Sequence, residues 1–508
     1  ATSALTFTGL AAGQSAGMKG NTSAVNGALN VTYAAAVTDG VINISGGTTA
    51  GVVTEVGAGI TSNIINSTGA ANTLTNVVLS GTANTALTIN AATSLQSGNI
   101  TGFTGTTSTI TVSGAATNVA ATTAAAALGS VNIGTVQTAT VGTITASGLT
   151  AGGLQAVLSS NVALVVTGGA GNDAITTGAV LATGSVDAGA GTADTLTVSA
   201  STHLATAALG AKYTNFEVLG VTNAVSVDLD NISGITAIQI TDGAGATAVT
   251  DMSATQAAAV QVIAANGAMT ASVKGAATVG QLDTVTMTYS NGNTTTSEDI
   301  NAGTGSVITS ASVETFNFVA VDDVTIADTT NMASWTAMNF SGAGDVALTT
   351  LAQAVILNSN ITSTSTGTVT LDANLSTGNG MAVTTGAGVD TITMALTDVG
   401  DVISTGAGVD TIKSNGAGVA EIQTVKYSAE TTGATSTSTT TIDGVAVTSA
   451  SVATSATDTV VATAAFTALT ADTTLANRGY TFADDGSGTV TVTGVQSSGD
   501  IAAKRIVY

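Results

Sequence analysis

One nine-residue segment has the residue types and spacing that suit a hard metal ion. Gly168-Gly169-Ala170-Gly171-Asn172-Asp173-Ala174-Ile175-Thr176 matches the pattern G-G-x-G-x-D-x-U-x, where U is apolar, at every fixed position. Its glycines permit positive φ and a tight turn, and its aspartate offers a carboxylate to a cation that takes six or more oxygen ligands. Because one turn cannot complete that coordination, we expect Ca²⁺ to join consecutive turns, each contributing its own aspartate.

Weaker copies follow at the positions where neighbouring turns belong. Asp187-Ala188-Gly189-Ala190-Gly191-Thr192-Ala193-Asp194 comes directly after the full match, with one extra residue before the final aspartate. Gly386-Ala387-Gly388-Val389-Asp390 recurs 20 residues later as Gly406-Ala407-Gly408-Val409-Asp410, with the degenerate turn Asp398–Asp401 between them. The predicted metal-site residues are Gly168, Gly169, Gly171, Asp173, Asp187, Gly189, Gly191, Asp194, Gly386, Gly388, Asp390, Asp398, Asp401, Gly406, Gly408 and Asp410.

Three other acidic glycine turns leave both interpretations open. Gly342-Ala343-Gly344-Asp345, Asp242-Gly243-Ala244-Gly245 and Asp484-Asp485-Gly486 fit calcium ligands, and they fit solvated aspartates that cap glycine-rich corners equally well.

Composition sets the fold class. The 508 residues include 60 Gly, no Pro, no Cys and only 3% aromatic residues. The many Thr and Val residues favour strands, Gly and Asn favour turns, and strong helix formers are scarce. Short strands punctuated by glycine predict an all-β protein, namely a parallel β-solenoid or β-roll with additional β-sandwich-like portions.

Charge divides the chain and excludes some partners. Lys and Arg total 8 against 31 acidic residues, so nothing could neutralise a row of nucleic-acid phosphates. All but two of the acids lie from Asp173 onward. No apolar run reaches about 18 residues, so no transmembrane segment is predicted. We expect the chain, which starts at Ala1, to be a processed or partial one.

These patterns suggest four parts. We expect residues 1–160 to form a neutral Thr/Ala/Asn-rich β domain for assembly or anchoring, 161–300 a solenoid segment with the glycine-aspartate turns, 301–430 a second β segment with such turns, and 431–508 a C-terminal β domain. A loose duplication relates Phe216–Leu219 to Val313–Phe316 and places Trp335 opposite Ile235.

Local signals predict a few individual elements. Thr284–Tyr289 alternates with period two and is followed by Asn291-Gly292, which is typical of a hairpin, and Thr489–Thr493 alternates as well. Short helices are expected at Ala120–Leu128 and Thr255–Ala265.

The nonapeptide resembles that of the RTX (repeats-in-toxin) proteins, which are exported by type I secretion. The Cys-free, nearly Lys-free composition, with a Phe216-Glu217-Val218-Leu219 strand after the glycine turns, is similar to the Caulobacter surface-layer family. This resemblance implies a secreted protein of a Gram-negative bacterium. It also implies calcium-dependent self-assembly into an extracellular lattice and attachment to lipopolysaccharide or another cell-surface glycan.

Enzymatic functions find little support. His203 is the only histidine, so a zinc-protease HExxH site is excluded. Asp228 with Asp230, or Asp322 with Asp323, could form an acid pair of a glycosidase, but solvated turn acids explain them better. We therefore predict a structural surface-layer subunit and no enzyme. The alternative is a calcium-stabilised filament or adhesin of the biofilm matrix.

Overall fold

Short alternating strands build this protein, as its computed structural model shows. The chain divides into two compact units, Ala1–Thr241 and Asp242–Tyr508. The predicted four-part division stays a prediction. The structure describes residues 3–20, 25–105, 107–119, 129–136, 140–222, 224–240, 246–263, 268–278, 281–291, 300–301, 307–332, 334–351, 359–373, 380–394, 402–414, 422–428, 435–442, 445–453, 455–494 and 504–507.

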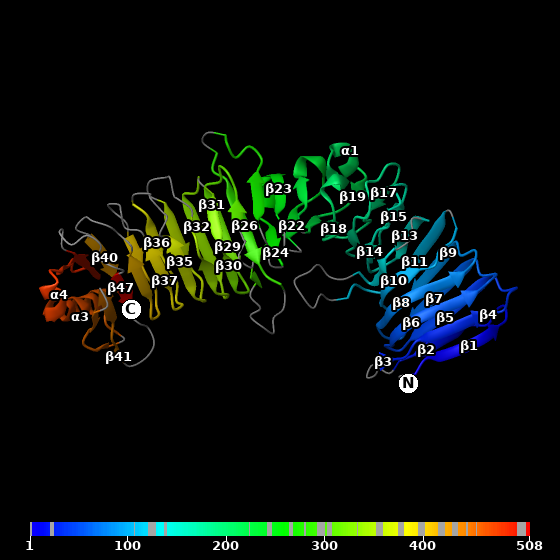
Figure 1. Cartoon of the computed structure of the whole chain (residues 1–508), viewed down its shortest axis with the longest axis horizontal. Helices are drawn as coiled ribbons and strands as arrows, with labels where there is room; N and C mark the ends of the chain where they lie inside the picture. Colours follow the sequence, from blue (N-terminus) through cyan, green and yellow to red (C-terminus); the bar gives the residue numbers. More distant parts are fainter. Residues whose placement is uncertain are drawn as a thin grey trace. The chain divides into compact units, whose positions relative to one another are not determined.

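The first unit is a parallel β-solenoid with two ladders of stacked strands (Figure 1). The first ladder joins β1 (Leu5–Leu10), β4 (Leu29–Tyr33), β6 (Thr49–Gly57), β8 (Asn72–Gly81), β10 (Leu95–Thr101), β12 (Val131–Thr135), β14 (Leu154–Val157), β16 (Ala174–Thr176), β18 (Thr195–Val198), β20 (Val218–Val221) and β22 (Ala237–Ile240). The second joins β2 (Ala16–Lys19), β5 (Asp39–Ser45), β7 (Ser62–Thr68), β9 (Ala86–Ala91), β11 (Ser108–Gly114), β13 (Val141–Leu149), β15 (Val165–Thr167), β17 (Ser185–Asp187) and β19 (Tyr213–Thr214).

Period-two alternation sends one face of each strand into the core. In the second ladder, Ile42, Ile65, Ile89 and Val112 lie in register on successive strands, and all are fully buried. The next position faces outward, where the Asn66 amide donates to Asn43 Oδ1 across 2.8 Å. The turns thus stack through an apolar core inside and an amide ladder outside.

Short elements decorate the first unit. These are β3 (Val25–Asn26), which pairs with β6, and β21 (Ser226–Asp228), the 3₁₀ helices η1 (Ser201–Leu204) and η2 (Leu229–Asn231), and α1 (Ala207–Gly210).

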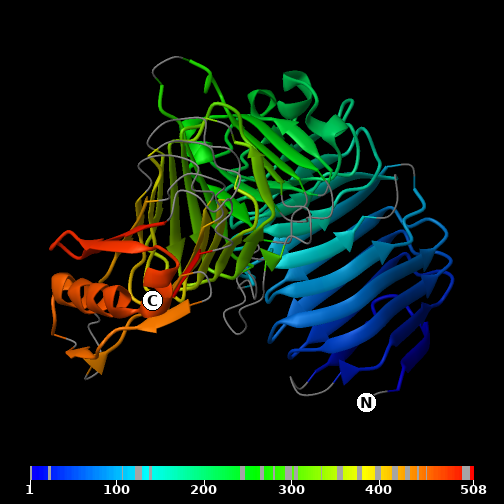
Figure 2. The same cartoon turned by 60° about the vertical axis from the view of Figure 1, so that its left-hand side comes forward.

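The second unit repeats the parallel stacking (Figure 2). Its main ladder comprises β24 (Val260–Val262), β26 (Thr284–Tyr289), β29 (Thr315–Ala320), β32 (Ala337–Gly342), β34 (Asn360–Ser363), β36 (Ala382–Thr384), β38 (Val402–Ser404) and β40 (Ile422–Lys426). A second comprises β27 (Ile300–Asn301), β30 (Val324–Ile326), β33 (Val346–Leu348), β35 (Val369–Ala373), β37 (Thr391–Met394) and β39 (Thr411–Ser414). A third comprises β23 (Thr247–Met252), β25 (Met269–Val273), β28 (Val307–Thr309) and β31 (Asp328–Asn331).

Antiparallel strands and helices follow the last parallel turns. β46 (Thr489–Thr493) pairs with β40 and with β45 (Thr481–Asp484), and β47 (Lys504–Val507) pairs with β39. The remaining elements are the pairs β41 (Thr435–Ser436) with β44 (Val452–Ala453) and β42 (Thr439–Ile442) with β43 (Val445–Thr448), and the helices α3 (Asp458–Ala471) and α4 (Thr473–Asn477).

The predicted all-β parallel solenoid is confirmed, with corrections in detail. Thr284–Tyr289 is a strand, but both its partners run parallel to it, so the predicted hairpin is wrong. The helix expected at Thr255–Ala265 is limited to α2 (Ala254–Ala257), because the apolar residues that follow join the ladder as β24. The helix α3 was not predicted. The expected helix Ala120–Leu128 lies outside the described residues.

Candidate metal site

Acidic side chains lie immediately before strands of the first ladder, one on each of three successive turns. Asp173 precedes β16, Asp194 precedes β18 and Glu217 precedes β20. Each carboxylate accepts a backbone N–H from the turn before it: Leu154 N donates to Asp173 Oδ1 at 2.6 Å, Asp173 N to Asp194 Oδ1 at 2.6 Å, and Asp194 N to Glu217 Oε2 at 2.9 Å. We call these three residues the first acid column.

Burial raises the pKa of the two aspartates in this column. Asp173 and Asp194 are 1% and 0% exposed. Burial raises the pKa of Asp173 to about 8, despite hydrogen bonds from the Leu154 and Gly169 amides, and the negative charges of Asp194 and Asp187 act in the same direction. Burial likewise raises the pKa of Asp194 to about 6. Removing like charges from water while stacking them disfavours the ionised forms unless a counter-charge is present.

A second acid column, formed by Asp390 and Asp410, has the same construction in the second unit. Val369 N donates to Asp390 Oδ1 at 2.8 Å, and Asp390 N donates to Asp410 Oδ1 at 2.9 Å. Both side chains are buried, and burial raises the pKa of Asp410 to about 6. The repeated Gly-Ala-Gly-Val-Asp segments therefore place their aspartates on neighbouring turns, as the sequence predicted.

The motif glycines serve mainly to let turns approach each other. Of those predicted, only Gly189 and Gly408 have positive φ, so the expectation that positive φ explains the set is wrong. A Cβ on Gly168 would collide with the carbonyl oxygen of Ala188, and a Cβ on Gly406 would collide with that of Gly386. Glycine is needed here because the backbone of the neighbouring turn occupies the side-chain position. Gly169, Gly171, Gly386 and Gly388 are crowded in the same way, whereas a Cβ on Gly191 would collide with the carboxylate of Asp194.

Other predicted residues take different places. Asp187 ends β17 in the second ladder, where it accepts the Gly189 N–H and the Asn215 amide at 2.9 and 2.7 Å, so it does not stack in the first acid column. Asp398 and Asp401 lie outside the described residues, as do Asp242 and its Gly-Ala-Gly segment. The carboxylate of Asp485 accepts the Ser487 hydroxyl and the N–H groups of Ser487 and Thr489, as a turn cap does, and these bonds lower its pKa to about 2.

The donor chemistry of the columns fits Ca²⁺. Asp194 Oδ2, Asp390 Oδ2 and Asp410 Oδ2 are buried and accept no hydrogen bond. A buried carboxylate oxygen without a partner is costly, and either a proton or a cation would remove that cost. Three or more acidic, His or Cys side chains do not converge on one point within the described ranges. Calcium does not require that arrangement, because backbone carbonyls and water complete its oxygen shell.

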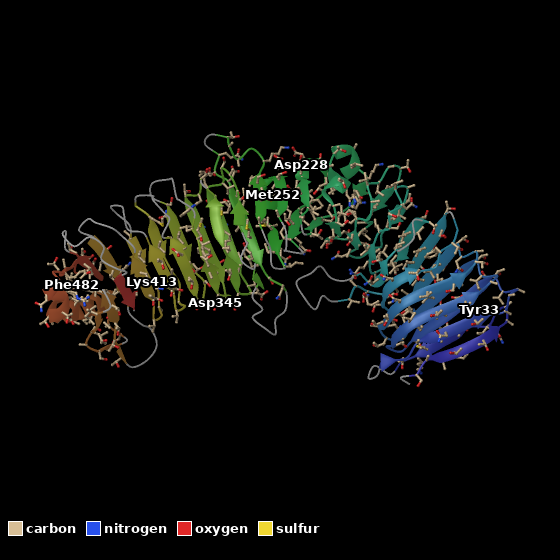
Figure 3. All side chains as sticks on the ribbon, in the orientation of Figure 1. Tyr33, Asp228, Met252, Asp345, Lys413 and Phe482 are labelled. Carbon is tan, nitrogen blue, oxygen red and sulfur yellow. The ribbon has the colours of Figure 1, made fainter. Side chains whose placement is uncertain are left out.

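Several acids that the sequence analysis did not assign to the metal site lie in related positions before strands. In the duplicated segment, Asp283 N donates to Glu314 Oε2 at 2.8 Å, just as Asp194 N donates to Glu217. Asp345, labelled in Figure 3, is exposed and bonds in the opposite direction: its N–H donates to Asp323 Oδ1 of the preceding turn at 2.9 Å, and its own Oδ1 accepts the Thr368 N–H at 2.6 Å. The sequence offered a signal for these positions, because each of these acids immediately precedes a strand.

The single histidine is buried and hydrogen-bonded. His203 is 7% exposed, and its Nδ1 lies 2.6 Å from the Thr177 hydroxyl. Burial lowers its pKa. Trp335 is fully buried, as its alignment with Ile235 predicted.

No protein-family model matches the chain, and neither does any curated protein or solved structure. Among the described residues, no helix combines the length and the apolar character needed to cross a membrane.

Proposed function

We propose that this chain is a secreted structural subunit that self-assembles into a calcium-stabilised surface layer on a Gram-negative bacterium, and that it is not an enzyme. The observation that carries the proposal is the stacking of buried acids one turn apart, with oxygens that lack any hydrogen-bond partner, in both units. Such columns suit a cation that joins successive turns.

The proposed mechanism is control of folding by charge. Without cations, the ionised columns oppose packing of their turns, because Asp390 and Asp410 stack as like charges inside the protein. Calcium, when bound, supplies the positive charge that these sites lack. Asp173, Asp194, Asp390 and Asp410 would hold it, so binding free energy becomes folding free energy outside the cell, where calcium is plentiful.

Assembly is supported by the faces that the solenoid presents. The outward amide ladder of Asn43, Asn66 and Asn90 is polar but uncharged. Copies of the first unit can therefore approach through this region without the repulsion expected of a chain with net charge −23. Surface glycan, lipopolysaccharide in particular, is the proposed anchor, and this part of the proposal comes from the sequence resemblance.

Circular dichroism and light scattering during calcium addition, followed by chelation, test the proposal on the full chain. Calcium is expected to increase β signal and scattering together, and chelation to reverse at least the folding signal. The Asp390→Asn, Asp410→Asn double variant should need more calcium than Asp230→Asn, which removes an exposed acid.

Negative-stain images of the calcium-treated protein decide the form of the assembly. Ordered two-dimensional sheets support a surface layer. Filaments would instead favour the fibre or adhesin, and a monodisperse protein whose folding ignores calcium contradicts both.

A further inference from the structure

A buried glutamate interrupts the apolar core of the first unit. Glu55 on β6 lies in register with Val31 on β4 and Leu79 on β8, and Val31 in turn pairs with Phe7. The column is otherwise apolar, yet Glu55 is only 2% exposed. Gly40 on β5 makes room for it, because a Cβ there would collide with Glu55 Oε1. A carboxyl group therefore sits between the two ladders.

Among the residues that the structure describes, no cationic side chain pairs with this carboxyl. Up to residue 172 the only other charged side chains are Lys19 and Asp39, and both are exposed. Tyr33 on β4, labelled in Figure 3, is the remaining titratable neighbour. Its hydroxyl is already engaged, donating to Val41 O at 2.9 Å and accepting from Val41 N at 2.7 Å. An ionised Glu55 would thus be an uncompensated charge in the core.

Two buried amides connect Glu55 to the following turns. One terminal atom of the Asn63 amide lies 2.8 Å from Glu55 Oε1 and 3.0 Å from Oε2. Its other terminal atom lies 3.1 Å from the Asn84 amide and 3.4 Å from the Ala86 carbonyl oxygen. The far atom of the Asn84 amide lies 3.4 Å from the Gly102 carbonyl oxygen.

The two carbonyls fix the direction of this chain of hydrogen bonds. A carbonyl oxygen can only accept, so the Asn84 nitrogen faces Gly102 and its oxygen faces Asn63. The Asn63 nitrogen then faces Asn84 and Ala86, which leaves the Asn63 oxygen against Glu55. Two acceptors at 2.8 Å repel each other unless one carries a proton. A protonated Glu55 satisfies this orientation, whereas an ionised Glu55 requires both amides to reverse, which turns their oxygens toward the Ala86 and Gly102 carbonyl oxygens.

We propose that Glu55 is held as a neutral carboxylic acid that donates a hydrogen bond to Asn63, and that loss of its proton reverses the Asn63 and Asn84 amides and loosens three turns of the first unit. After reversal, the Asn63 nitrogen donates to the carboxylate and the Asn84 oxygen faces the Gly102 carbonyl. Glu55, Asn63 and Asn84 form an amide relay that makes this unit sensitive to pH. Burial, which raises the pKa of Glu55 to about 7, acts in the same direction.

Carbon-13 NMR of the full chain, labelled at the glutamate side-chain carboxyl, tests this. The chain has six glutamates. One resonance is expected to titrate with a midpoint near 7, to disappear in Glu55→Gln and to persist in Asp39→Asn, which removes a nearby exposed carboxyl. The proposal is overturned if all six titrate in the ordinary range of about 4 to 5.

A second variant distinguishes the effect of the amide relay from the effect of burial alone. It can be measured even if the Glu55→Gln variant does not fold. Asn84→Ala removes the amide that the Gly102 carbonyl orients, so Asn63 can more easily turn its nitrogen toward the carboxylate. The titration midpoint of the unusual resonance should then fall toward the ordinary range, which corresponds to a several-fold decrease in proton affinity. An unchanged midpoint in this variant would contradict the relay.

Discussion

The backbone N–H of Asp390 donates to the side chain of Asp410, 20 residues later, across 2.9 Å. Asp390 therefore connects two neighbouring turns, because its N–H donates to Asp410 in the next turn and its carboxylate accepts the Val369 N–H from the preceding one. This relationship recurs between Asp173 and Asp194, and the predictions for the metal site depend on it.

Calcium should stabilise the second unit through this pair. At a free concentration 100 times the dissociation constant, each bound ion adds about 2.7 kcal/mol to the free energy of unfolding. Trp335, the only tryptophan and fully buried, reports unfolding of this unit by its fluorescence. The Asp390→Asn, Asp410→Asn double variant should abolish the calcium-dependent increase in the free energy of unfolding. An equal shift in the variant and the parent would place the ions elsewhere.

Removing one carboxylate from the first acid column should destabilise the first unit even without calcium. Asp194→Ala leaves the Asp173 N–H buried without an acceptor, which should lower the free energy of unfolding by about 1–3 kcal/mol. Asp194→Asn keeps an acceptor oxygen and removes the charge, so its loss should be smaller. Denaturant titrations of the three proteins in chelator give the comparison, and a more harmful Asn variant would argue against this order.

A single methyl group should distinguish the motif glycines from ordinary ones. Gly168→Ala drives a Cβ into the Ala188 carbonyl, whereas Gly142→Ala meets Thr107 only at 3.9 Å. We expect Gly168→Ala to lower the midpoint of thermal unfolding clearly and Gly142→Ala to leave it nearly unchanged. Similar midpoints for the two variants would mean that the turns do not pack at the spacing described.

The stability of the first unit should fall as pH rises through the neutral range. The folded state holds the Glu55 proton with a pKa of about 7, against an ordinary value of 4.5, so its contribution is complete below about 4.5 and is lost by about pH 7. The difference corresponds to about 3 kcal/mol. Unfolding followed in chelator should show this loss in the parent and in Asp39→Asn, while Glu55→Gln should lack that component.

Much of this architecture could be predicted from the sequence, because both its strand pattern and its glycine turns are local signals. The Gly-Ala-Gly-Val-Asp repeats placed Asp390 and Asp410 on adjacent turns through their 20-residue spacing alone. Pairing direction could not be predicted in the same way. Asn291-Gly292 is typical of a hairpin, yet β26 joins a parallel ladder because its apolar face continues the stacked core.

Contacts between distant turns were the least predictable. Glu55 stands in the neutral part of the chain with no motif around it, and only the fold brings Gly40, Asn63 and Asn84 to it. Glu217 and Glu314 were recognised as parts of a duplicated segment, but their role as acceptors for Asp194 and Asp283 depends on the register between turns. Helix α3 was missed because its Ala- and Thr-rich residues resemble the surrounding strands.

The acid that precedes each strand also bears on how such a chain can change in length. The turns of Asp173 and Asp194 each bring one backbone donor and one carboxylate acceptor, so excising or duplicating such a complete turn should preserve the bonding of its neighbours, whereas a cut within the turn breaks two hydrogen bonds. We therefore expect gene rearrangements that preserve whole coils to disturb the solenoid less than rearrangements that cut within a coil.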